Sequence, residues 1–277
     1  MIFLDPQEVE AAQQGDRAAL DRLLRSAERP VYNLAIRFLA HPADAEDATQ
    51  EILILIITNL GALRETTSAG AWAMRIACRH LVGRRKKSRV EKMRLTFEGF
   101  AKDLEQGLSD PPDAINVTPE TTLAIEEIKI SCTLAVLTCL SRPLRIAYVL
   151  GEIFEMADSE SARILEISPT TYRQRLKRAR AAVTEFVSNS CGIVAPQAAC
   201  RCERRLNAAE TTGRVKRGHP IFDRSTEQEY DLPELRTHIR ALEEGRKTAA
   251  LMRSNPDFNS KITELVIELT KPGLHTS

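Results

Sequence analysis

MADSESARILEISPTTYRQRLKRARAAV, residues 156–183, is the stretch that most narrows the fold, because it predicts two amphipathic helices joined by a short turn. Ser168-Pro169 suits the start of the second helix, since Ser accepts an orphan backbone N–H at an N-cap and Pro fits the first helical position. Four residues of that helix recur at helical spacing and form one apolar stripe: Tyr172, Leu176, Ala179 and Val183. The pattern indicates a helix-turn-helix unit.

The opposite face of the second helix is polar and basic. In a helix-turn-helix the N-terminal part of this helix enters the DNA major groove, and basic residues beyond it hold phosphates. Arg173 and Gln174 are assigned to base edges, because a forked donor or an amide can identify G or A. An amphipathic helix with a solvated basic face is the alternative. The candidate DNA-binding residues are Thr170, Thr171, Arg173, Gln174, Lys177 and Arg178.

The bulk properties are those of an ordinary soluble protein. The 277 residues suffice for two or three small domains, and a hydrophobic fraction of 43% with few aromatic residues favours helices. The N-terminus lacks the pattern of a signal peptide, and the longest apolar run, residues 52–57, is too short to cross a bilayer. We therefore expect a cytoplasmic protein without a membrane partner, whose six cysteines stay reduced.

The charge is strongly segregated along the chain. The formal net charge of +1 conceals a basic block at residues 75–94, in which Glu91 is the one acid, and a second basic block at residues 173–180. The stretch between residues 98 and 127 is acidic. Separate basic blocks in a near-neutral chain predict local contacts with a polyanion.

Helical spacing of apolar residues extends over most of the chain, and its interruptions suggest the domain organisation. From residue 95 the pattern dissolves into an acidic stretch with several Gly and Pro, which indicates a flexible linker. The sequence predicts an all-α fold with two small helical domains, residues 1–94 and 121–188. A flexible acidic linker, residues 95–120, joins them, and a cysteine-containing loop with a helical extension, residues 189–277, follows.

DAEDATQEILILIITNL, residues 44–60, predicts a helix with an unusual surface. Asp44, Asp47 and Glu51 are spaced so that they share one face, which Ile54 extends. The apolar run at residues 52–57 is unbroken, so a one-sided helix cannot bury all of it. An apolar strip beside carboxylates suits a partner with basic residues around a hydrophobic seam. A solvated acidic face over a thick core helix is the alternative.

WAMRIACRHLVGRRKKSR, residues 72–89, joins the one tryptophan of the chain to a dense basic run. Trp72, Arg75 and Arg79 lie near one helical face. An aromatic ring that stacks on an unpaired base, beside cations for the backbone, is what binding of single-stranded DNA requires. The alternative is that Trp72 is a core residue.

In order and spacing, these segments resemble the extracytoplasmic-function (ECF) sigma factors over roughly residues 10–188. Residues 30–63 and the tryptophan helix look like sigma region 2, and residues 140–183 look like region 4. The resemblance implies a protein without catalytic activity that binds RNA polymerase core and directs promoter-specific transcription initiation at −35 and −10 elements. It implies no cofactor. The subgroup suggested by the tail is one with a cysteine-containing C-terminal extension.

The resemblance also implies roles for individual residues. The acidic helix would dock on the clamp helices of the largest polymerase subunit, and the flap of the second-largest subunit is a further expected contact. Promoter DNA is the other partner, and an anti-sigma factor would be a third. The polymerase-binding residues would be Asp44, Asp47, Gln50, Glu51 and Ile54. The residues that bind the −10 element would be Trp72, Arg75, Arg79, Arg84 and Arg85.

The extension contains the string CGIVAPQAACRC, residues 191–202. Cys191, Cys200 and Cys202 can bind zinc as thiolates if a fourth ligand such as His219 completes the shell. They can also form a redox switch or be ordinary reduced thiols. Two amphipathic segments follow, and we expect them to pack on the first or second domain and to alter access to polymerase. Three further cysteines fall in helical patterns and are predicted core residues: Cys78, Cys132 and Cys139.

Two other classes of protein fit parts of the sequence less well. A helix-turn-helix regulator that acts at operators without replacing a sigma factor explains the region around Arg173, but neither the acidic helix nor the tryptophan helix. An enzyme is disfavoured, because the chain has no nucleophile elbow, phosphate-binding glycine loop or His-rich metal motif.

Overall fold

The computed structural model describes residues 2–84, 88–93, 95–110, 118–224, 231–260 and 262–269. Their regular structure is helical, and the extended pairing within these ranges is limited to isolated bridges. The predicted all-α class is therefore confirmed. Within the same ranges no helix is both long and apolar enough to span a membrane.

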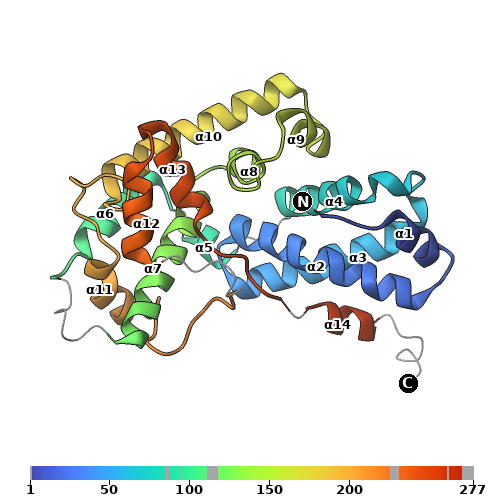
Figure 1. Ribbon diagram of the computed structural model, residues 1–277, viewed down its shortest axis with the longest axis horizontal. Helices are drawn as coiled ribbons and strands as arrows, with labels where there is room; N and C mark the ends of the chain where they lie inside the picture. The colour runs from blue at the N-terminus through green and yellow to red at the C-terminus, as the bar shows by residue number, and fades with distance from the viewer. Residues whose placement is uncertain are drawn as a thin grey trace.

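The N-terminal part of the chain is a bundle of four helices, drawn in blue and cyan in Figure 1. Aspartates begin the first two helices: the Asp5 and Asp16 carboxylates accept backbone N–H groups there. The second helix ends at Ala40, which has a left-handed backbone, and Pro42 then starts the third helix. The helices of the bundle are α1 (Pro6–Gln13), α2 (Arg17–Leu39), α3 (Pro42–Asn59) and α4 (Ala69–Gly83).

The second module contains the predicted helix-turn-helix. Ser168 caps the recognition helix as expected, since its hydroxyl oxygen accepts the Thr171 N–H at 3.1 Å. The Tyr172 hydroxyl donates to the Ala147 carbonyl at 3.2 Å and joins the second helix of the unit to the helix that precedes the unit, Arg142–Tyr148. All four residues of the predicted apolar stripe are buried. The elements are α8 (Arg142–Tyr148), the π-helical turn η4 (Val149–Ile153), α9 (Asp158–Ile164) and α10 (Pro169–Ser190).

The predicted flexible linker at residues 95–120 is wrong over much of its length, because a helix occupies it. Thr96 caps this helix, and its Phe100 ring stacks on Phe186 of α10 with the ring centroids 5.4 Å apart. The apolar residues of the segment are helically spaced, but the surrounding acids, Gly and Pro concealed that period. Residues 111–117 of the predicted linker lie outside the described residues. The connecting helices are α5 (Arg89–Lys92), α6 (Phe97–Gln106) and α7 (Pro119–Thr138).

The C-terminal extension packs on both modules, as predicted. Figure 1 shows α12 and α13 lying against the α6–α7 end of the molecule, while α14 lies beside the N-terminal bundle. Helix α13 contacts η4 and α10, and α14 contacts α2 and α3. The elements of the extension are η5 (Glu203–Arg205), α11 (Leu206–Thr211), α12 (Leu232–Ala241), α13 (Glu244–Arg253) and α14 (Ile262–Leu269).

The extension is joined to the bundle through a buried polar contact. The Asn33 side chain donates to the Phe258 carbonyl at 2.9 Å and accepts the Phe258 N–H at 3.0 Å. The Arg37 guanidinium lies over the Phe258 ring, 5.3 Å from its centroid, and burial lowers the pKa of Arg37 to about 10. One continuous cluster of buried side chains reaches from Ile2 to Val266, so the modules share a core.

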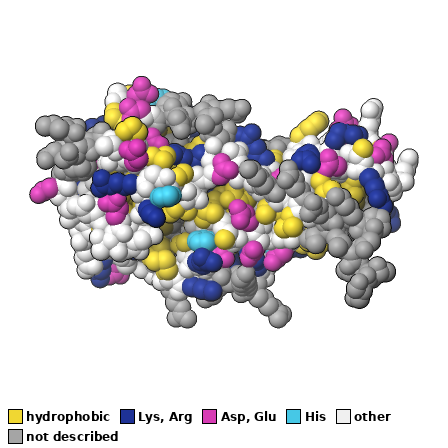
Figure 2. Space-filling view, turned by 90° about the horizontal axis from the view of Figure 1, so that it is seen from below, with side chains coloured by type: hydrophobic (Ala, Val, Ile, Leu, Met, Phe, Trp, Pro, Cys, Tyr) yellow, Lys and Arg dark blue, Asp and Glu magenta, His cyan; other side chains and the backbone are white. Residues whose placement is uncertain are grey.

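The surface seen in Figure 2 mixes both signs of charge. Basic and acidic side chains alternate over this face, and hydrophobic side chains come to the surface along its middle. A mixed face of this kind attracts no polyanion as a whole. Nucleic-acid binding therefore has to be sought on particular helices.

Candidate nucleic-acid interface

Helix α3 presents an acidic and apolar surface to solvent. Asp47 and Glu51 are exposed, and Gln50 between them is half-buried. Ile54 and Leu55 are 37% and 36% exposed, although Ile52, Leu53 and Ile56 of the same run are buried. The predicted unburied part of residues 52–57 is therefore present. Helical spacing places Leu55 on the core face together with Ile52, and this prediction is wrong, because Leu55 lies in the exposed strip.

Asp44 does not share that surface, so the predicted common face of three acids is wrong at this residue. Its side chain is buried, and its Oδ2 accepts the Arg89 N–H at 2.8 Å. The same oxygen lies 3.5 Å from Nδ1 of His41. Asp44 therefore holds the first turn of α3 to the start of α5. Helical spacing could not indicate this, because the contact comes from a segment 45 residues away in the chain.

Helix α4 carries the predicted single-strand surface. Arg79 is exposed, Arg75 is half-buried, and the half-buried Trp72 packs against the core on one side. The core interpretation of Trp72 therefore holds in part, and its stacking on an unpaired base stays a prediction. Among the described residues, the buried Nε of Arg75 has no hydrogen-bond partner.

Arg84 is built into the fold instead of projecting to solvent. Its side chain is 5% exposed and donates to the Asp44 carbonyl and to Oε1 of Glu51, both at 3.2 Å. These contacts fasten the end of α4 to α3. In the sequence Arg84 stands in a basic run, and it was therefore predicted to bind DNA. Its side chain is buried against α3 in the structure, so it is not available for that contact. Arg85, the other member of that run in the set, lies outside the described residues.

The recognition helix α10 presents its predicted face to solvent. Thr171 is half-buried, and its Oγ1 lies 2.8 Å from Oγ of Ser168, so it supports the N-cap. The five other candidates are exposed: Thr170, Arg173, Gln174, Lys177 and Arg178.

The turn of the helix-turn-helix lies against α4. Glu166, in this turn, has a left-handed backbone with φ 55°, and its carboxylate forms an ion pair with Arg79. The hydrogen bond from Arg79 lowers the pKa of Glu166. Arg79, which is predicted to bind the −10 element, is therefore paired with a residue of the helix-turn-helix.

A buried ion-pair cluster, formed by Glu91, Arg142 and Arg145, fastens the second module to the first. The Glu91 carboxylate accepts from Arg142 at 2.8 Å and from Arg145 at 2.9 Å, and Arg145 also donates to the Phe38 carbonyl at 2.7 Å. Burial opposes ionisation of Glu91, but the hydrogen bonds from Arg142 and the Ser88 N–H lower its pKa to about 2. This cluster was not predicted from the sequence, where its one signal is that Glu91 is the single acid of a basic block.

The three cysteines proposed as metal ligands lie near one another. Cys191 and Cys200 form an isolated backbone bridge, and Cys202 is buried nearby with Cys132 of α7. Burial raises the pKa of all four thiols, that of Cys200 to about 11, so they are protonated at neutral pH. Within the described ranges, no three His, Cys, Asp or Glu side chains are grouped to hold a metal ion. The zinc and redox interpretations stay predictions.

The N-terminal bundle is similar to a known family of domains. Residues 23–90, which run from α2 through α4 into α5, match the family model of Sigma-70 region 2. This segment contains both the exposed face of α3 and the tryptophan helix.

Individual relatives extend the similarity into the second module. The RNA polymerase sigma-H factor of Pseudomonas aeruginosa is 28% identical over 189 residues, which cover 65% of this chain and 91% of that protein. The ECF RNA polymerase sigma-E factor of Escherichia coli is 27% identical over 189 residues, or 65% and 92% of the two chains. The ECF RNA polymerase sigma factor SigE of Mycolicibacterium smegmatis is 25% identical over 187 residues, or 66% and 68%.

Proposed function

We propose that this protein is an RNA polymerase sigma factor of the ECF group, which binds the core enzyme in the cytoplasm and directs promoter-specific initiation. One observation carries the proposal: a single chain combines a Sigma-70 region 2 domain, whose α3 exposes carboxylates beside an apolar strip, with an exposed recognition helix. A regulator that only binds operators gives no role to the α3 surface. Catalysis belongs to the polymerase in this proposal.

The polymerase contact is assigned to the exposed face of α3. Asp47, Gln50 and Glu51 supply charge and hydrogen bonding, and Ile54 with Leu55 supplies the apolar seam. Basic side chains around a hydrophobic groove would complement this face. The clamp helices of the largest polymerase subunit are the proposed partner, and the second module is proposed to contact the flap of the second-largest subunit. Asp44 acts indirectly, by holding the start of α3 in place.

The −10 contact is assigned to the Trp72, Arg75 and Arg79 face of α4. The half-buried Trp72 ring is assigned to stacking on an unpaired base, and the half-buried Arg75 and exposed Arg79 supply positive charge for the phosphates. Arg84 is given a supporting role, because it fastens this helix to the polymerase-binding helix.

Run-off transcription tests the function directly. Purified bacterial core polymerase is assayed with and without the full chain, on promoter fragments from the genome that encodes it. The expected result is specific transcripts that appear only with the protein. If the protein binds a duplex but neither binds core nor yields transcripts, the operator-binding alternative replaces this proposal.

Two substitutions on α10 should separate base recognition from phosphate contact. Arg173→Ala should weaken binding to the preferred −35 duplex by about 1–3 kcal/mol and reduce discrimination among duplexes. Lys177→Ala should weaken binding to all duplexes alike. It should also reduce the salt dependence of the affinity by the equivalent of about one phosphate contact. Fluorescence anisotropy over a series of salt concentrations measures both. Equal loss of discrimination in the two variants would contradict the assignment.

The Glu166–Arg79 ion pair should compete with −10 binding. Glu166→Gln removes the negative partner of Arg79, so affinity for a single-stranded −10 oligonucleotide should rise, by up to about fivefold for an exposed pair. Glu185→Gln, an exposed site further along α10, is the matched control and should leave the affinity unchanged. Equal affinities in the wild type and Glu166→Gln would show that Arg79 does not contact this DNA.

The extension is proposed to regulate the arrangement of the two modules, and with its cysteines it would place the protein in a subgroup that carries such a tail. The proposal rests on contacts between the extension and each of the two modules. Asn33 of α2 binds Phe258, while Arg253 of α13 forms an ion pair with Glu155 of the second module at 2.6 Å. A change in the extension would therefore reach both modules. An anti-sigma factor remains a further proposed partner.

A further inference from the structure

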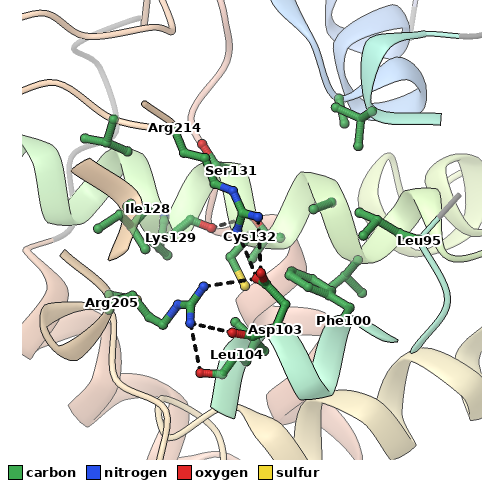
Figure 3. A pocket seen from close by; sticks show the side chains of 18 of the residues that line it. Leu95, Phe100, Asp103, Leu104, Ile128, Lys129, Ser131, Cys132, Arg205 and Arg214 are labelled. Atoms are coloured by element: carbon green, nitrogen blue, oxygen red, sulfur yellow. Dashed lines mark hydrogen bonds and ion pairs between the residues drawn. The ribbon is translucent and has the colours of Figure 1, made fainter. Parts of the chain in front are cut away.

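A cavity of about 570 Å³ lies where α6, α7, the end of α10 and the extension meet (Figure 3). Natural small-molecule pockets have volumes of about 300–1,000 Å³. None of the described residues assigned to polymerase or DNA lines this cavity. Most of the lining is apolar and includes Leu95, Phe100, Leu104, Ile128, Val136 and Phe222.

One side of the cavity is cationic. In Figure 3 the Arg205 and Arg214 guanidinium groups point toward Asp103, and Oδ2 of Asp103 lies 3.0 Å from Arg205 and 2.9 Å from Arg214. Lys129 also lines the cavity, and its ammonium donates to the carbonyl and hydroxyl of Ser254. His41 is the other titratable nitrogen base in the lining.

The charges in this lining do not balance. Among the described residues that form it, Asp103 is the one carboxylate and pairs with Arg205 and Arg214, whereas Lys129 is a third cation. Lys129 is 7% exposed, and burial lowers its pKa to about 8. A buried cation such as Lys129 is stabilised by an anion that offers charge-assisted hydrogen bonds, and the neighbouring Arg214 side chain is 41% exposed.

We propose that this cavity binds a small molecule with an apolar body and one anionic group, such as a medium-chain carboxylate. The anion is held by Arg214 and Lys129, and the apolar body lies among Phe100, Leu104 and Val136. A neutral apolar molecule leaves the cationic side uncompensated, and a cationic one is repelled. Because α6, α7 and the extension all line the cavity, the ligand stabilises their packing by mass action.

This site is independent of the proposed transcription function, and its test needs no polymerase. The full chain is titrated with the probe 1-anilinonaphthalene-8-sulfonate, and decanoate or 1-decanol is added as competitor. The expected result is one probe per chain, displaced by decanoate, with 1-decanol at least about tenfold weaker because it lacks the charge.

Two arginines of one segment give a matched pair of variants. Arg214 lines the cavity, whereas Arg217 pairs with Glu210 at 2.6 Å and does not line it. Arg214→Met should weaken decanoate binding about tenfold or more, and Arg217→Met should leave the affinity for decanoate unchanged. Cys132→Phe fills part of the cavity and should reduce binding of both probe and decanoate.

Three results would overturn the proposal: no saturable binding to the wild type, equal competition by decanoate and 1-decanol, or equal decanoate affinity in the two arginine variants. The unfolding temperature of each variant is measured alongside. If Cys132→Phe does not fold, the arginine pair decides the matter alone.

Discussion

Reversing the charges of Asp47 and Glu51 to lysine should abolish transcription that depends on this protein. Both carboxylates lie on the exposed face of α3 beside Ile54 and Leu55. Placing like charges against a basic partner costs several kcal/mol, so affinity for core polymerase should fall by at least about a hundredfold. Binding to fluorescently labelled core enzyme and run-off transcription measure the effect.

Two companion variants distinguish a lost interface from a damaged fold. Glu51 also contacts Arg84 and His80, so Asp47→Lys alone tests the surface without removing those contacts. Glu185→Lys makes the same charge change at an exposed site on α10 and should keep core binding intact. Binding of a −35 duplex should be unchanged in all three proteins. Normal core binding by Asp47→Lys would remove α3 from the proposed interface.

Glu91→Gln should produce the largest loss of stability among single substitutions at the contact between the modules. The Glu91 side chain is 8% exposed and pairs with Arg142 and Arg145, the latter 3% exposed. Removing one partner of a buried pair leaves an uncompensated charge, which typically costs about 3–5 kcal/mol. Denaturant unfolding at neutral pH measures the loss, and Glu98→Gln, in the exposed pair with Lys102, should show no measurable change.

The lowered pKa of Glu91 makes the free energy of unfolding depend on pH. The value of about 2 lies below the ordinary 4.5, so the ionised form is favoured by folding. The contribution of ionised Glu91 to the free energy of unfolding is fully present above about pH 4.5 and is lost as the pH falls towards 2. The stability difference between wild type and Glu91→Gln should therefore be constant above pH 5 and shrink below pH 4. A difference that persists unchanged at pH 3 would contradict the assignment.

Features set by neighbouring residues in the chain were predictable. The Ser168 cap and the apolar stripe of α10 appear as expected, because capping and helical spacing act within a few residues. The exposed part of residues 52–57 was predictable for the same reason, since a single helix cannot turn six consecutive side chains inward. Helix α6 was not predicted, because its few apolar residues become a stabilising face only when α10 packs on them.

The sequence by itself determined the all-α class, the helix-turn-helix and the outward faces of α3 and α10, because local periodicity and capping decide these. Only the tertiary structure decided which charged residues are available for binding. Asp44 and Arg84 belong to the same charge patterns as Asp47 and Arg79, yet α5 and α3 bury them. The pairing of Glu91 with Arg142 and Arg145 spans 51 and 54 residues. Contacts at such separations arise from packing between distant segments, so residue spacing along one helix cannot predict them.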